Sequence, residues 1–179
     1  MKIAILQMGK IEQNILEFIR KNLARAFLRT EVMILNGIVV LSPEAFDAPR
    51  KQYYSSLLLM LVREYARKTD ADKTLGVTNA DMFMPQLNFV FGEAESPGKA
   101  AIVSLARLDP EFYGIRRDES LFLERAAKEA IHETGHTFGL SHCSDPSCVM
   151  SFSNSIYEVD FKRPEFCPKC STRLIKTID

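Results

Sequence analysis

Two hydrophobic patterns follow one another at the start of the chain. Residues 2–8 form a short apolar run that suits a buried strand. Residues 11–28 carry apolar side chains at the three- and four-residue spacing of an amphipathic helix. Basic residues gather toward the end of this second stretch, where the helix dipole favours them. We therefore predict a strand followed by a helix.

The dipeptide Asn36-Gly37 separates two β-prone runs, residues 32–35 and 38–41. Asn-Gly is the pair most typical of a tight hairpin turn, which predicts two antiparallel strands here. A single strand with a bulge at Gly37 is the competing interpretation, and the sequence alone does not separate the two. Residues 42–50 follow with two prolines and are predicted to form a loop.

A long helix is predicted over residues 52–68. Its central residues, 57–62, are all apolar, so the helix is apolar on every side. A helix of this kind is expected to be buried on most sides.

Three further β-prone runs follow, at residues 73–79, 87–92 and 101–106. Pro85 separates the first two, and a turn predicted at residues 93–99, which includes Ser96-Pro97-Gly98, precedes the third. Because a helical pattern comes next, we expect the third run to end the sheet-forming part of the chain.

The next helix is predicted over residues 119–138, with Asp118 as its N-cap. Strands and helices thus mix along the chain, which predicts the α/β (α+β) class in one domain, residues 1–179. Residues 1–138 would form the sheet and helices, and residues 139–179 a C-terminal subdomain. The latter segment has little apolar periodicity and looks irregular, so something other than a hydrophobic core must hold it.

The length and composition of the chain bear on its domain size and its net charge. The 179 residues suffice for one hydrophobic core, and 46% of them are hydrophobic. Lys and Arg total 23, as do Asp and Glu, so no net charge attracts nucleic acid or an anionic membrane. The sequence has neither a signal-peptide pattern nor an apolar run of about 18 residues. We expect a monomer in the cytoplasm that binds neither nucleic acid nor membrane.

The protein has 3 histidines, and all of them fall within residues 131–142. His132 and His136 are four apart on the predicted helix, so both imidazoles can reach one metal ion. Gly139 can adopt the left-handed conformation that ends a helix, after which the chain can turn back and deliver His142. The alternative is that the three histidines are unrelated and lie close together in the sequence by chance. Three nitrogen donors with one open position predict a catalytic zinc site.

Glu133 lies about 100° around the helix from His132, close enough to touch a zinc-bound water without becoming a ligand. Zinc lowers the pKa of such a water toward about 7 and polarises a substrate carbonyl. Glu133 would take the proton from that water and pass it to the departing amine. An inert surface carboxylate is the alternative for this residue.

The 4 cysteines are Cys143, Cys148, Cys167 and Cys170. Their spacing is typical of a closed structural zinc site, and it predicts a second zinc ion per chain. Two disulfides, or a redox-active Cys-x-x-Cys pair, are the alternatives. Because Cys143 follows His142 directly, we expect the two metals to lie within about 15 Å of each other.

Taken together, His-Glu-x-x-His-x-x-Gly-x-x-His-Cys, Cys-x-Met and Cys-x-x-Cys resemble the archaemetzincin family of the metzincin clan. Residues 85–92 and 104–108 are similar to that family too. The resemblance implies a zinc metalloprotease with a metzincin-like twisted mixed sheet, an antiparallel edge strand, backing helices and an active-site helix. It implies that Met150 is the Met-turn, and that residues 101–105 are the edge strand that pairs with a peptide substrate.

One position departs from related metzincins. Astacin-like and serralysin-like members have a tyrosine two residues after the Met-turn methionine, where this chain has Phe152. No phenol from that position can assist at the zinc. Arg107, Arg116 and Arg117 could bind a substrate carboxylate, although a solvated surface role is the commoner one for arginine.

The function predicted from these observations is hydrolysis of peptide bonds in a peptide or small-protein substrate. One alternative is a metzincin-fold protein that binds peptides with little or no turnover. Another is a zinc-dependent regulatory or storage protein, in which both metal sites serve the fold.

Overall fold

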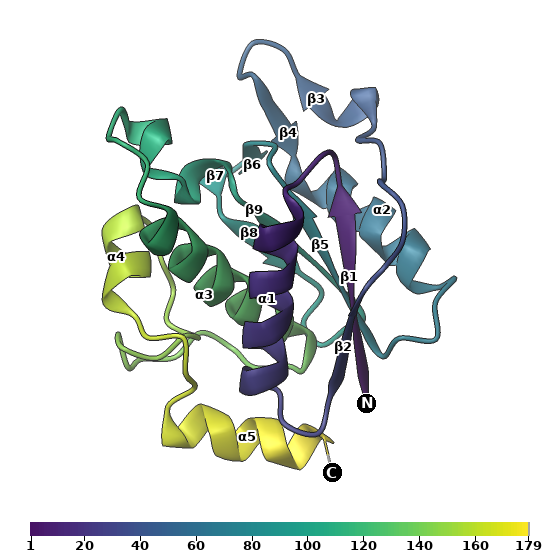
Figure 1. Ribbon diagram of the computed structural model, residues 1–179, viewed down its shortest axis with the longest axis vertical. Coiled ribbons are helices and arrows are strands. Elements are labelled where there is room, and N and C mark those ends of the chain that lie inside the picture. The colour runs from purple at the N-terminus through teal and green to yellow at the C-terminus, as the bar shows by residue number, and fades with distance from the viewer. Residues whose placement is uncertain (179) are drawn as a thin grey trace.

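A five-stranded mixed sheet forms the centre of the protein in the computed structural model, which describes residues 1–178 and only the backbone of Ile178 (Figure 1). Its strands lie in the order β2 (Glu31–Ile34), β1 (Lys2–Met8), β5 (Lys73–Thr78), β9 (Ala100–Ser104) and β8 (Gly92–Ala94). The first four are parallel, and β8 runs antiparallel to β9. The predicted class, a mixed sheet with an antiparallel edge strand, is confirmed.

A second, smaller sheet has the order β3 (Phe46–Asp47), β4 (Gln52–Tyr54), β6 (Met82–Met84) and β7 (Leu87–Val90). The run 87–92, predicted as one strand, is divided between the two sheets: β7 belongs to the small one and β8 to the main one. Strand β6 was not predicted, because its three residues, between Asp81 and Pro85, carry too short a pattern.

Helices cover both faces of the main sheet. Helices α1 (Gln13–Ala26) and α3 (Glu119–Thr137) pack on one face, and α2 (Ser55–Ala66) packs on the other (Figure 1). The two-residue period of β9 divides its side chains accordingly, since Ala101 and Val103 belong to the core beside α1 and α3. Ala100 and Ile102 belong to the core beside α2. Two of the three predicted helices, 11–28 and 119–138, are confirmed to within two residues at each end.

Strand β9 is central and not an edge. It pairs with β5 on one side and with β8 on the other, so its backbone groups are used within the sheet. The expectation that residues 101–105 form the antiparallel edge is therefore wrong. The edge strand is β8, which the sequence pattern had assigned partly to a turn.

The segment around Asn36-Gly37 is not a hairpin. Strand β2 runs parallel to β1, and Val39 further along still bridges Met8 in the parallel sense. Between those contacts β1 advances from Ile5 to Met8 while the neighbouring segment advances from Ile34 to Val39, so two residues loop out. The tight turn needs positive φ at both central residues, and here only Gly37 has it, at 96°. The chain returns to β1 after this interruption, which is closer to the competing interpretation of a single strand with a bulge at Gly37, although β2 ends at Ile34 and is followed by an isolated bridge at Val39.

Helix α2 begins at Ser55 because residues 52–54 form β4. It buries Leu58, Leu59 and Val62 against the sheet, but Leu57 and Met60 are exposed. The expectation of burial on most sides is wrong, since the sheet covers only one face of this helix. None of the helices in the described part of the chain is long and apolar enough to cross a membrane.

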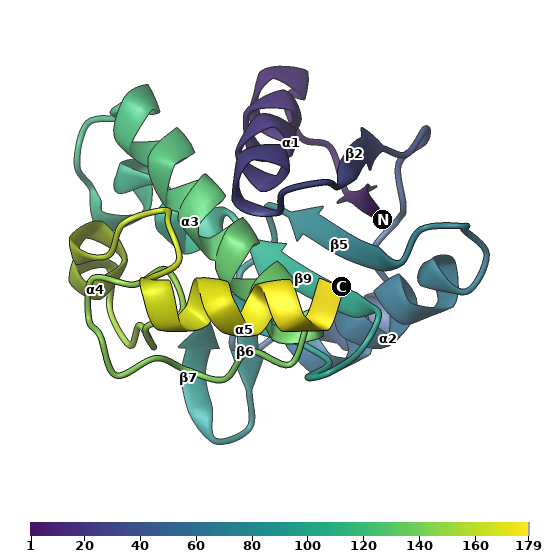
Figure 2. The same ribbon diagram turned by 90° about the horizontal axis from the view of Figure 1, so that it is seen from below.

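The C-terminal segment contains two helices that the sequence did not reveal, α4 (Ile156–Phe161) and α5 (Pro168–Ile178). Ser155 and Glu158 form a capping box at the start of α4, a local signal that sequence analysis could have used. Helix α5 crosses the end of the molecule below α1 and α3 (Figures 1 and 2). Asp179, the last residue of the predicted C-terminal subdomain, lies outside the described residues.

Lys73 connects the sheet to the end of α3. Its ammonium group donates to the carbonyl of Thr137, at the last residue of that helix, over 2.7 Å and to the carbonyl of Gly98 over 2.6 Å. It also lies 4.7 Å from the centroid of the Phe138 ring. A cation at a helix C-terminus interacts favourably with the exposed carbonyls, so Lys73 fixes the end of α3 against the sheet.

We expect Lys73→Met to lower the free energy of unfolding by about 2 kcal/mol, because two charge-assisted hydrogen bonds are lost. Urea denaturation followed by circular dichroism measures this change. Lys99→Met is the matched control, since Lys99 is an exposed neighbour whose change is expected to stay within about 0.5 kcal/mol. Equal stability of the two variants would contradict the role assigned to Lys73.

Candidate active site

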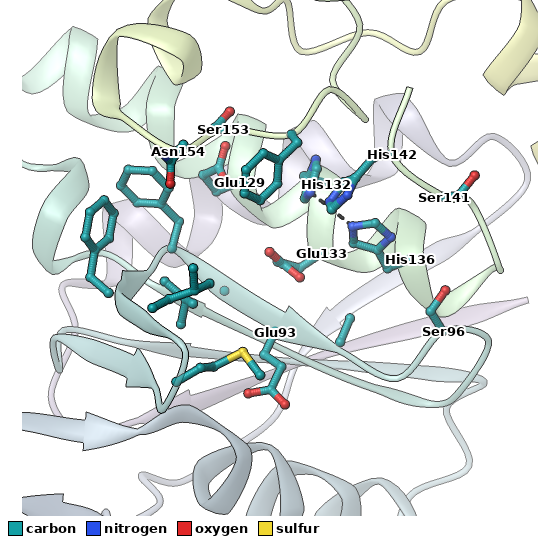
Figure 3. A pocket seen from close by; sticks show the side chains of 18 residues that line it. Glu93, Ser96, Glu129, His132, Glu133, His136, Ser141, His142, Ser153 and Asn154 are labelled. Carbon is teal, nitrogen blue, oxygen red and sulfur yellow. Dashed lines mark hydrogen bonds between the residues drawn. The ribbon is translucent and has the colours of Figure 1, made fainter. Parts of the chain in front are cut away.

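Helix α3 and the turn after it bring the three histidines together. Asp118 caps the helix by accepting a hydrogen bond from the Leu121 backbone N–H, as predicted. His132 and His136 lie on its last turns, and Gly139 ends it with φ of 79°. The chain then reverses, so that one ring nitrogen from each of His132, His136 and His142 lies within 4.8 Å of the others (Figure 3).

Backbone carbonyls set the orientation of the first two imidazoles. His132 donates from Nδ1 to the carbonyl of Val149 over 2.8 Å, and His136 donates from Nδ1 to the carbonyl of Leu140 over 2.6 Å. In a neutral imidazole the other nitrogen, Nε2, then carries a lone pair. The two Nε2 atoms are 3.1 Å apart. Two lone pairs at that distance repel each other, whereas a cation between them is attracted to both, so this donor set fits a metal ion.

Burial keeps the imidazoles in the neutral form that a metal requires. It lowers the pKa of His132 well below its usual value, and the positive charge of Lys162 lowers it further. Burial also lowers the pKa values of His136 and His142. Neutral nitrogens are therefore available at neutral pH without competition from protons.

Glu133 lies beside the histidines with its side chain directed into the cleft (Figure 3). Its residue is 6% exposed, and burial together with the charge of Glu129 raises its pKa well above the usual value. A carboxylate with a raised pKa is a stronger proton acceptor than one in water. The electrostatics therefore suit a general base.

Gly92 makes room for Glu133. A Cβ atom at Gly92 would lie 2.4 Å from Cγ of Glu133, closer than side-chain atoms can approach. The glycine thus lets the edge strand β8 pass directly against the glutamate. Sequence analysis missed this residue, although an isolated glycine inside a β-prone run signals close approach of another group.

Met150 is fully buried behind α3, where the helix carries Gly135. A Cβ atom at Gly135 would lie 2.6 Å from Sδ of Met150, so the glycine admits the thioether against the helix. The Met150 carbonyl accepts a hydrogen bond from the Cys143 N–H over 2.9 Å. The ring of Phe152 lies 5.0 Å from that of His142 and is tilted against it by 59°.

The four cysteines also converge. Their sulfur atoms all lie within 4.8 Å of one another, and Sγ of Cys143 is 3.7 Å from Sγ of Cys167. Sulfurs that share a tetrahedral zinc lie about 3.8 Å apart, given a Zn–S bond of about 2.3 Å. All four cysteines are free, which argues against the disulfide alternative. This donor set fits zinc as well.

The cleft in front of the histidines has a volume of about 450 Å³. Apolar residues of β7 and its neighbours form one wall, and Phe152, Ser153 and Asn154 form part of the opposite rim. Glu93, Glu129 and Glu133 are the acidic residues among its lining, which includes no lysine or arginine from the described residues.

The three arginines considered for carboxylate binding lie elsewhere. Arg107 forms a two-point ion pair with Asp81, and its guanidinium group lies 4.3 Å from the ring of Phe89. Arg117 pairs with Glu119 over 2.9 Å, and Arg116 is exposed. None of the three lines the cleft. Arg116 fits the predicted solvated surface role, whereas the Arg107 side chain is only 22% exposed and is held by its ion pair.

A family model, Peptidase family M54, matches residues 2–176. The chain belongs to this family. It is 44% identical over 174 residues to archaemetzincin of Methanocaldococcus jannaschii, covering 97% of this chain and 93% of the relative. It is 40% identical over 179 residues to archaemetzincin of Pyrococcus abyssi, covering 98% and 95%. The resemblance to archaemetzincins is thus confirmed, and the chain is a zinc metallopeptidase of that family.

Solved structures show the same fold in M54 relatives. The crystal structure of archaemetzincin from Methanopyrus kandleri superposes with a TM-score of 0.87 at 39% identity, covering 99% of this chain and 95% of that one. Archaemetzincin from Archaeoglobus fulgidus, complexed with malonate, gives 0.82 at 38%, covering 97% and 99%. A zinc-dependent peptidase from Methanocorpusculum labreanum gives 0.87 at 31%, covering 96% and 99%.

We expect Gly92→Ala to lower peptidase activity about 100-fold while leaving zinc content unchanged. The added methyl group displaces Glu133 without touching a histidine, and a shift of about 1 Å in a catalytic group costs roughly that factor. Steady-state kinetics and metal analysis measure the two quantities.

Gly114→Ala is the control for this variant. Gly114 has a φ of 71°, a backbone conformation that favours glycine. An added Cβ there meets nothing within 4 Å, so the substitution strains the backbone without displacing a neighbour. Its substitution should cost stability through backbone strain and leave activity intact. Full activity of Gly92→Ala would show that Glu133 does not need its present position.

Proposed function

We propose that this M54 peptidase hydrolyses peptide bonds with a water molecule as nucleophile and Glu133 as general base. The observation that carries the proposal is the convergence of the three imidazole nitrogens beside the buried carboxylate of Glu133. The metal ligands in this proposal are His132, His136 and His142. Zinc bound there would polarise the scissile carbonyl and lower the pKa of the attacking water.

In this scheme Glu133 accepts a proton from the attacking water as the C–O bond forms. The protonated carboxylic acid then donates that proton to the amide nitrogen as the C–N bond breaks, so the leaving amine departs neutral. The raised pKa of Glu133 supports the first step, because a group that binds its proton more tightly is the better base. Gly92 allows the carboxylate to occupy this position.

The substrate in this proposal is a peptide or a small protein in an extended conformation. Strand β8 is the sheet edge that borders the cleft, and Gly92 and Ala94 line that cleft. On either side of β8, the Phe91 carbonyl accepts from the Ser104 N–H and the Glu95 N–H donates to the Ala100 carbonyl. Because hydrogen-bonding residues alternate along an antiparallel strand, residues 91, 93 and 95 face β9. The backbone groups of Gly92 and Ala94 therefore face the open edge, where a peptide can pair with them.

We further propose two zinc ions per chain, the second held by Cys143, Cys148, Cys167 and Cys170. The close sulfur positions support it. Such a site would join the turn after His142 to the start of α5, which carries Cys170. We also propose that the protein acts as a monomer in the cytoplasm.

We expect Glu133→Gln to lower kcat by a factor of about 10² to 10⁴ and to leave the zinc content unchanged, because it removes the proton acceptor and no ligand. A library of fluorogenic peptides with zinc-loaded protein provides the assay. Glu93→Gln is the control, since Glu93 also lines the cleft but accepts its hydrogen bond from Ser56. Activity that survives in Glu133→Gln rejects this residue as the base.

The same assay distinguishes the alternative of a peptide-binding protein. A zinc-loaded wild type that binds peptides and cleaves none of them would contradict hydrolysis and support binding alone.

We expect wild-type protein to contain two zinc ions and Cys170→Ala to contain one, with the remaining ion still removable by a mild chelator. Three thiolates hold zinc more weakly than four, so α5 should detach and become sensitive to limited proteolysis. Metal analysis by mass spectrometry gives the count. Thr172→Ala, an exposed position on the same helix, is the control and should keep both ions.

A further inference from the structure

The ammonium group of Lys162 is buried directly behind the candidate active site. The Lys162 side chain is 0% exposed, and its Nζ lies 2.7 Å from Oε1 of Glu129, whose side chain is 3% exposed. Removing two such charges from water is costly, and a buried pair often contributes little to stability. A positional role accounts better for this pair than a stabilising one.

Lys162 holds a short backbone segment that also orients a histidine. Its Nζ donates to the carbonyl of Ser151 over 3.3 Å. Two residues earlier, the carbonyl of Val149 accepts the hydrogen bond from Nδ1 of His132. The segment 149–151, which contains Met150, is therefore attached to α3 at two points. One attachment is direct, through His132, and the other passes through Lys162 to Glu129.

The two attachment points lie on neighbouring turns of one helix. Glu129 and His132 are three residues apart in α3 and so occupy the same face. Segment 149–151 cannot slide along that face without breaking one of the two contacts. Rotation of the His132 ring is restricted for the same reason, because its partner carbonyl is fixed.

The ion pair with Glu129 also reduces the cost of placing the Lys162 ammonium near the three histidines. An ammonium group alone near three imidazoles would repel a metal ion, and its charge does lower the pKa of all three histidines. The carboxylate of Glu129 lies against the ammonium, and its negative charge opposes the effect of Lys162 on the pKa of His142. Paired in this way, the ammonium imposes a smaller electrostatic penalty on metal binding than it would alone.

Two other buried cations between α3 and α4 provide a contrast. Arg125 forms a two-point ion pair with Asp160 of α4. Lys128, whose side chain is 2% exposed, pairs with the half-exposed Glu124 and donates to the Asp160 carbonyl. Both attach α4 to α3, and their hydrogen bonds and ion pairs do not involve segment 149–151.

We propose that Lys162 is a positioning residue for the three-histidine site. By binding the Ser151 carbonyl and Glu129 together, it holds the Val149 carbonyl where it orients His132, with Nε2 of His132 toward the other two imidazoles. The inference rests on the proposed zinc site. In this inference Lys162 slows the loss of metal from the site and fixes the orientation of His132.

The test compares metal release from the wild type with that from Glu129→Gln/Lys162→Met. The double variant removes both charges, so no unpaired charge remains buried, and it also removes the donor to Ser151. We expect release of zinc from the three-histidine site to a chelator to be about 10-fold faster, within the range seen when groups behind a ligand are removed. The zinc of the four-cysteine site is left in place throughout.

A second measurement does not depend on metal. Nitrogen NMR of the metal-free protein reports which nitrogen of His132 carries the proton. In the wild type we expect the proton on Nδ1 alone, and in the double variant a mixture of both tautomers. The visible spectrum of cobalt at the histidine site should change in parallel.

Lys128→Met is the matched control, because it removes an equally buried lysine from the same interface and leaves only a half-exposed partner. It should release zinc at the wild-type rate with His132 unchanged. The inference is overturned if the double variant equals the wild type in both measurements, or if Lys128→Met changes them as much. A wild type that binds no zinc at the histidines would instead overturn the proposed function.

Discussion

The imidazoles of His132 and His136 are held so that their Nε2 lone pairs repel each other, and the surrounding structure keeps them in that arrangement. His132 and His136 both donate from Nδ1 to a backbone carbonyl, so their Nε2 lone pairs meet 3.1 Å apart. Such an arrangement is stable only with a cation between the nitrogens, and the fold supplies several features that enforce it. Gly139 ends the helix at the required place, and Met150 fills the space behind it.

Buried charge distinguishes the C-terminal region from the rest of the molecule. The sheet and its helices are held by two apolar cores. Helix α4 adds Ile156 and Val159 to the first core, and it is further attached to α3 by the ion pairs Arg125–Asp160 and Lys162–Glu129 and by a hydrogen bond from Lys128 to the Asp160 carbonyl. Ion pairs have directional geometry, so they fix the register between two helices more sharply than apolar contact does. Such geometry suits a region that holds segment 149–151 against α3.

The two donor sets are joined by covalent structure. His142 and Cys143 are adjacent, and the Cys143 N–H bonds to the carbonyl of Met150 behind the helix. Movement of the cysteine cluster would therefore displace His142 and segment 149–151 together. The cysteine cluster can thus be understood as support for the cleft, since residues 139–155 contain no regular helix or strand of their own.

The sequence by itself determined the local features: the long helix with its Asp118 cap, the spacing of the histidines and cysteines, and the family. These depend on residues close in the chain, where periodicity and ligand spacing are fixed by backbone geometry. Only the tertiary structure decided that β9 is central and β8 is the edge, since strand pairing joins distant segments. It alone brought Gly92 against Glu133 and Lys162 against Glu129, because such contacts depend on how separate elements pack.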